Sequence, residues 1–120
     1  MSTEQNRPLT DHERELARWM LENGSSEARD YLAQLERAEV TPWKCPCGCA
    51  SINFRIKGSL EPPPRVHILG EYLVGGADNP SGAFIFSSDG ILGGIEVYGL
   101  AGEAPRVLPR PDELRPSKAT

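Results

Sequence analysis

The chain of 120 residues is long enough for one domain, and its formal net charge of −4 argues against a nucleic-acid partner. It contains neither an apolar run of about 18 residues nor a basic amino-terminal segment followed by an apolar one, so it predicts no membrane span and no secretory signal. We therefore expect a cytoplasmic protein whose cysteines meet a reducing environment.

Two amphipathic helices are predicted in the amino-terminal third of the chain, after a flexible segment over residues 1–9. Thr10 and Glu13 have the spacing of a capping box, which predicts a helix over residues 11–22. A second stripe of apolar residues at helical spacing predicts another helix over residues 26–38. Because the connection between them is short, we expect the two helices to pack as a pair.

From residue 40 onward the apolar period changes to two, which predicts strands. Apolar and polar residues alternate over residues 50–57, and a second extended run follows over residues 66–74. Residues 84–86 and 91–98 flank an Asp-Gly turn and predict a hairpin. We expect the second run to pair with the first in an antiparallel sheet of about four strands.

These elements predict an α+β fold in which the helical pair covers one face of the antiparallel sheet. Residues 10–101 would form the single domain, and residues 102–120 an extended, proline-rich tail. The opposite face of the sheet would then be open.

Two segments carry a resemblance to known proteins. Residues 45–52 read Cys-Pro-Cys-Gly-Cys-Ala-Ser-Ile, and residues 86–98 read Phe-Ser-Ser-Asp-Gly-Ile-Leu-Gly-Gly-Ile-Glu-Val-Tyr. Behind a helical pair, they resemble a family of small uncharacterised bacterial proteins with a Cys-x-Cys-Gly-Cys segment and a Phe-x-x-Asp-Gly-x-Leu-x-x-Ile-Glu-Val-Tyr-like hairpin. The chain departs from that pattern at Pro46, where glycine is expected. The resemblance implies the α+β fold and a bacterial origin, and it carries over no catalytic residue.

Cys45, Cys47 and Cys49 are the only cysteines of the chain and form its one cluster of reactive groups. Thiolates are ligands for soft ions such as zinc and copper, and neighbouring thiols also support redox chemistry. On a straight strand, alternate residues stand about 6.6–6.8 Å apart, whereas sulfurs that share one ion lie within about 4 Å of one another. Pro46 and Gly48 predict a bend that would gather the three thiols.

A fourth ligand is needed for a tetrahedral zinc site. His67 is a weak candidate, because pairing of its strand with residues 50–57 would place it far from Cys49. His12, a carboxylate, a water or the thiol of a partner protein would serve as well. Cu(I), which accepts two or three thiolates, fits this ligand count better than structural zinc. A dyad of Cys49 with either histidine would instead pair a nucleophile with a base.

The simplest interpretation leaves the cysteines as small packing residues under the helices. The leading functional hypothesis is then a small bacterial, non-enzymatic binding or interaction module. Its protein partner would contact the open sheet face and the cysteine loop, and an exposed sheet edge would allow two chains to form a homodimer. The alternative is a thiol-dependent metal-binding protein, for zinc or copper, or a redox enzyme that uses Cys45, Cys47 and Cys49.

Overall fold

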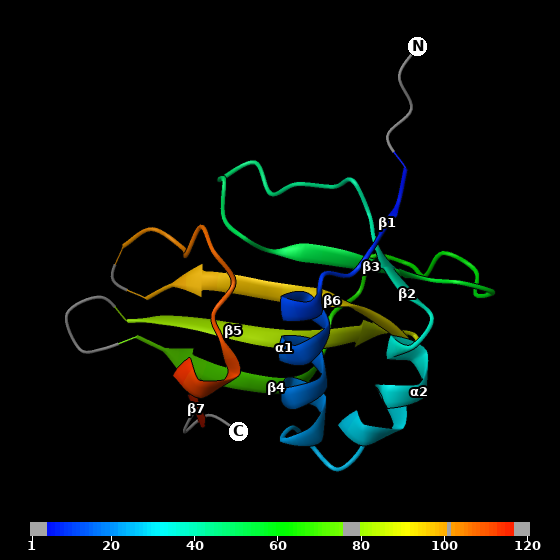
Figure 1. Cartoon of the computed structure of the whole chain (residues 1–120), viewed down its shortest axis with the longest axis horizontal. Helices are drawn as coiled ribbons and strands as arrows, with labels where there is room; N and C mark the ends of the chain where they lie inside the picture. Colours follow the sequence, from blue (N-terminus) through cyan, green and yellow to red (C-terminus); the bar gives the residue numbers. More distant parts are fainter. Residues whose placement is uncertain (1–4, 76–79, 101, 117–120) are drawn as a thin grey trace.

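The computed structural model describes residues 5–75, 80–100 and 102–116. Within these ranges the chain has the predicted α+β class, with two α-helices and one seven-stranded antiparallel sheet (Figure 1). Helix α1 spans Asp11–Glu22, and the short helix α2 spans Leu32–Leu35 after a 3-10 turn at Ala28–Tyr31. Both helices lie in front of the same face of the sheet in the view of Figure 1.

The strands are long at the centre of the sheet and short at its edges. They are β1 (Arg7–Pro8), β2 (Ala38–Val40), β3 (Ile52–Ile56), β4 (His67–Val74), β5 (Ser81–Ser88), β6 (Ile91–Gly99) and β7 (Leu114–Pro116). Their order across the sheet is β1-β2-β3-β6-β5-β4-β7. Strands β5 and β6 form the central hairpin around the Asp89-Gly90 turn, where φ is 49° and 80°. Positive φ at both central residues gives the turn the twist that a two-residue hairpin needs.

The sheet has seven strands rather than the predicted four. The additional strands β1, β2 and β7 are only two or three residues long. An alternating pattern cannot be recognised in so few residues, so they escape detection from the sequence. Strand β7 belongs to the predicted proline-rich tail, yet it pairs with the end of β4. Residues 1–4 and 117–120 of the two predicted terminal segments lie outside the described residues.

The continuous helix predicted over residues 26–38 is wrong. After α2 the chain turns into β2, in which Ala38 pairs with Ile56 and Val40 with Phe54. The side chains of Ala38 and Val40 are only 7% and 2% exposed. Pairing with β3 therefore buries Ala38, the last apolar residue of the predicted helical stripe, in a strand, and the tertiary contact decides the conformation.

The predicted pairing of residues 50–57 with residues 66–74 is also wrong. Strand β3 pairs with β2 and β6, whereas β4 pairs with β5 and β7. The connection between β3 and β4 contains three consecutive prolines, which lack the N–H groups of a tight hairpin ladder. The chain therefore crosses to the far side of the central hairpin before it re-enters the sheet. As a result, two strands separate His67 on β4 from β3.

The capping box of α1 is formed as predicted. The hydroxyl of Thr10 accepts a hydrogen bond from the Glu13 amide at 3.1 Å, and the Glu13 carboxylate accepts one from the Thr10 amide at 2.8 Å. Arg7 donates two further bonds to this carboxylate, at 2.9 and 2.8 Å. The bonds from Arg7 hold the pKa of Glu13 below its ordinary value despite partial burial. Arg7 thereby ties β1 to the start of α1.

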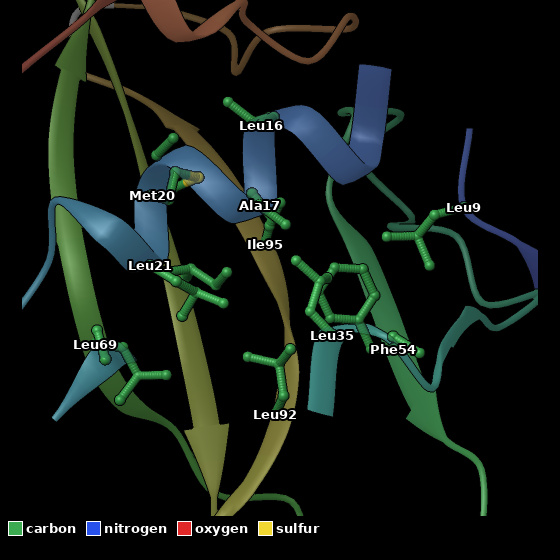
Figure 2. Close-up of a cluster of buried hydrophobic side chains, with 14 of the residues drawn as sticks. Leu9, Leu16, Ala17, Met20, Leu21, Leu35, Phe54, Leu69, Leu92 and Ile95 are labelled. Carbon is green, nitrogen blue, oxygen red and sulfur yellow. The ribbon is translucent and has the colours of Figure 1, made fainter. Parts of the chain in front are cut away.

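The hydrophobic core lies between α1 and the central strands (Figure 2). Its fully buried side chains include Leu16, Ala17, Met20 and Leu21 of α1 and Leu69, Ile85, Leu92 and Ile95 of the sheet. Burial of one such large side chain contributes about 1.5–3 kcal/mol to folding. Within the described residues, no helix has both the length and the apolar character needed to cross a membrane.

Candidate metal centre

The cysteine loop, defined as residues 45–49, is a tight turn that leads toward β3. The Gly48 amide donates a hydrogen bond to the Cys45 carbonyl at 2.9 Å and closes the turn. Gly48 has φ of +85°, a left-handed conformation that glycine adopts without strain. The proline at the second position of the turn has the fixed φ that such turns favour. The predicted bend at Pro46 and Gly48 is confirmed.

This bend gathers the three thiols. The sulfurs of Cys45 and Cys47 lie 2.8 Å apart, and all three sulfurs lie within 4.8 Å of one another. A Zn–S bond of about 2.3 Å places tetrahedral sulfurs about 3.8 Å apart. The Cys45–Cys47 distance is shorter than this value, so binding of one ion would require these two side chains to move apart. The three cysteines are close enough together to hold a metal ion.

The thiols are accessible. Cys47 is exposed and Cys45 is half-buried, while Cys49 is half-buried and packs against the margin of the core. The interpretation of the cysteines as packing residues under the helices therefore does not describe Cys45 or Cys47. Their sulfurs can be reached by an ion or a reagent from solvent.

Hydrogen bonds shift the pKa values of Cys47 and Cys49 in opposite directions. Partial burial raises the pKa of Cys49, but hydrogen bonds with Ser51, Cys47 and Cys45 outweigh it and lower this pKa to about 7. Hydrogen bonds with Cys45 and Cys49 raise the pKa of Cys47 to about 11. Of these two thiols, Cys49 is therefore the one that ionises closer to neutral pH.

Ser51 connects the cysteine loop to the central hairpin. Its hydroxyl lies 3.2 Å from the Cys49 sulfur and accepts a hydrogen bond from the Val97 amide of β6 at 3.0 Å. Ser51 is buried, so this link is shielded from water. The sequence analysis missed Ser51, although it continues the alternation of Cys45, Cys47 and Cys49 along the chain.

A cleft of about 740 Å³ adjoins the cysteine loop, and positively charged side chains line it. Lys44 and Arg106 lie in its lining, together with Arg7, whose guanidinium is bonded to Glu13. Among the described residues, no aspartate or glutamate lines this cleft. The charged side chains that line the described part of this cleft are therefore all positive.

Arg106 reaches the cluster because the segment after β6 returns along the sheet. The Ala50 amide donates a hydrogen bond to the Pro105 carbonyl at 2.9 Å, which holds this segment beside the loop. A guanidinium nitrogen of Arg106 lies 3.6 Å from the position that a β-carbon on Gly48 would occupy. Arg106 lies in the predicted tail, far from the cysteines in sequence, and no motif there indicates its role.

The structure does not bring either histidine to the cysteines. The Nε2 atom of His67 lies 2.5 Å from the carboxylate of Glu27, and that of His12 lies 3.2 Å from the Leu108 carbonyl. In the part of the chain that the structure describes, no other histidine, cysteine, aspartate or glutamate joins the group of three sulfurs. Neither a Cys–His dyad nor a fourth protein ligand is assembled there.

Comparison with protein-family models, with curated proteins and with solved structures finds no match for this chain. The resemblance to small bacterial proteins with a Cys-x-Cys-Gly-Cys segment stays a prediction. Functional inference depends on the geometry of the site.

Proposed function

We propose that this protein binds one soft metal ion, zinc or copper, through the thiolates of Cys45, Cys47 and Cys49. The observation that supports this function is the convergence of three accessible sulfurs within 4.8 Å on one bent loop. Cysteines that serve only as packing residues are expected to be buried among apolar side chains, without exposure to solvent or contact between their sulfurs. Thiol-dependent metal binding is therefore favoured over a binding module in which the cysteines have no chemical role.

Three cysteine ligands are compatible with two ions, Cu(I) and Zn²⁺. Three thiolates satisfy Cu(I), which needs no further donor. Zn²⁺ takes four ligands, so three cysteines would leave one coordination position open, as in zinc sites that act on a substrate. Three sulfurs that lie close together can bind either ion, and metal analysis of the purified protein distinguishes the two.

A functional ion fits the position of the site better than a structural one. The buried core is built by α1 and the central strands, and Cys49 alone of the three cysteines packs at its margin. An ion at an exposed loop would contribute little to holding these elements together. Binding, transfer or sensing of the ion is therefore favoured over stabilisation of the fold.

Metal analysis of the protein purified under reducing conditions tests this proposal. We expect about one zinc or copper ion per chain, and none in a variant with all three cysteines changed to serine. The variant His67→Ala is the matched control and should keep its metal, because His67 contacts Glu27 instead of the cluster. Metal well below one ion per chain after incubation with either ion, or metal retained by the triple variant, would contradict the proposal.

A protein partner at the open sheet face is a second candidate function. On this face the rings of Phe84 and Phe86 lie 5.9 Å apart, and those of Phe84 and Tyr98 lie 6.1 Å apart. The Tyr98 hydroxyl donates a hydrogen bond to Glu71 at 2.6 Å. Aromatic surfaces that end in polar groups are frequent in interfaces. The cysteine loop would extend this contact surface.

Sedimentation at increasing protein concentration tests the simplest partner, a second copy of the chain. A concentration-dependent homodimer that is lost in Phe86→Asp would support pairing through the open face. A dimer that persists in this variant would assign the contact to another surface, such as a sheet edge. A monomer at every concentration would exclude the second copy as the partner.

A further inference from the structure

We propose that the zinc-loaded site binds a small thiol that carries carboxylates, with the ligand sulfur at the fourth position and its carboxylates against Lys44 and Arg106. This inference depends on the proposed metal function and names the ligand of the same site. The argument rests on the coordination number, the cleft and its charge.

The coordination number calls for one more donor. The three sulfurs come from a single loop and lie on its accessible side. Among the described residues, no further side chain of a ligating type joins them. Since zinc in proteins takes four ligands, the remaining donor comes from outside these residues. Sulfur is the donor that matches three existing thiolates in softness.

The cleft beside the loop gives such a ligand a place to bind. Its volume of about 740 Å³ falls within the range of small-molecule pockets, about 300–1,000 Å³. Cys45 and Cys49 lie in its lining and Cys47 does not, so the cleft adjoins the cluster on the side of these two cysteines. The half-exposed indole of Trp43 forms an apolar part of the same wall.

The charge of the cleft selects an anionic ligand. Arg7 is already bonded twice to Glu13, which leaves Lys44 and Arg106 as the cations available to a ligand. Arg106 lies 3.4 Å from Glu103, but both side chains are largely exposed, and pairs of this kind are weak. Carboxylates on the ligand would satisfy both cations, whereas a neutral thiol would satisfy neither.

Binding requires no change of oxidation state. The ligand thiol gives its proton to the buffer, and a sulfur lone pair forms the bond to zinc. Solvent leaves the fourth position. No electron is transferred, and no co-reactant is needed.

Titration calorimetry on the zinc-loaded protein tests the inference with three probes. Mercaptosuccinate carries a thiol and two carboxylates, 2-mercaptoethanol carries the thiol alone, and succinate carries the carboxylates alone. We expect mercaptosuccinate to bind with one molecule per chain and about five- to tenfold more tightly than mercaptoethanol at low ionic strength, which corresponds to two exposed ion pairs. Succinate should bind far more weakly than either thiol. Zinc retained on the protein is measured after each titration.

A double variant isolates the contribution of the cations. Each variant is first loaded to one zinc ion per chain. In the double variant Lys44→Gln and Arg106→Gln, the ratio of the affinities for mercaptosuccinate and mercaptoethanol should fall. It should reach the ratio with which the same two thiols bind zinc ions free in solution. Arg18→Gln removes one positive charge from the exposed side of α1, away from the cleft, and should keep the preference. High salt should reduce the preference of the unchanged protein, because it screens exposed charges.

The outcomes separate this inference from the proposed function. Absence of stoichiometric metal would overturn both. Binding of Cu(I) but not Zn²⁺ would leave the metal function and overturn the ligand. Zinc binding with equal affinity for both thiols, or a preference that is undiminished in the double variant, would also overturn the ligand alone.

Discussion

The central hairpin and the cysteine loop use the same backbone chemistry for opposite purposes. Both turn at a glycine with positive φ, Gly90 at 80° and Gly48 at 85°. The hairpin carries Ile85 and Ile95, which are fully buried, whereas the loop presents Cys47 to solvent. A turn within the sheet aligns two long strands for packing. A different turn at the margin of the sheet, with Pro46 at its second position and Gly48 at its last, concentrates reactive groups, so stability and function should respond to different substitutions.

The largest effect should come from the hairpin. Replacement of Ile95 by alanine creates a cavity in the core and should lower the free energy of unfolding by about 2–5 kcal/mol, measured by urea denaturation. Leu60 is 86% exposed, and Leu60→Ala should change this free energy by less than about 0.5 kcal/mol. If the folded Ile95→Ala variant at low temperature bound less metal than the unchanged protein, the proposed independence of the two regions would be wrong.

Ser51→Ala should affect both regions at once. Loss of the hydroxyl leaves the buried amide of Val97 without its partner, which should lower stability by about 1–3 kcal/mol. The same change removes a hydrogen bond from Cys49, so the pKa of Cys49 should rise above about 7. Urea denaturation and the pH dependence of alkylation of Cys49 measure the two effects. A stability loss with an unchanged pKa would show that Ser51 serves the hairpin alone.

The pH dependence of metal affinity should change slope near neutral pH. Below the Cys49 pKa of about 7, a metal ion must displace the proton of this thiol, so affinity falls by an additional factor of about ten for each pH unit. Above this pH that contribution disappears. A plot of log affinity against pH, from chelator competition, should therefore lose one unit of slope near pH 7. In Ser51→Ala the change should move to higher pH.

The smallest effect should come from Gly48→Ala, and it has a close control. Gly48 and Gly58 share φ of +85°, and a β-carbon on either would lie 3.6 Å from an arginine nitrogen. Alanine at either position should cost about 1–2 kcal/mol of left-handed strain. Only Gly48→Ala should also weaken metal binding, because Gly48 shapes the cysteine loop. Equal metal affinity in the two variants would contradict the view that the turn gathers the thiols.

Local signals predicted more of this molecule than long-range contacts did. Helix α1 has its predicted bounds because the capping box of Thr10 and Glu13 acts within one turn. The bend of the cysteine loop was likewise visible in Pro46 and Gly48. The second helix was predicted too long, because Ala38 at its expected end pairs with β3, a partner that the helical period does not indicate.

The wall of the site depended on contacts between distant segments and could not be predicted. Arg106 lies beside the loop because the backbone of Ala50 is hydrogen-bonded to Pro105, a residue far away in the sequence. Ser51 gains its role only when β6 lies beside it. The ligand types of the site were therefore visible in the sequence, while its electrostatic surroundings were not.

The bond between Ala50 and Pro105 has a consequence for how this site can change. It places Arg106 beside Gly48 of the cysteine loop, on a segment that contributes this exposed side chain and little to the core. The residue at position 106 can therefore be exchanged for one of another charge without repacking the interior. The proposed preference of the cleft for anionic ligands would thus be adjustable independently of the fold, in evolution as in engineering.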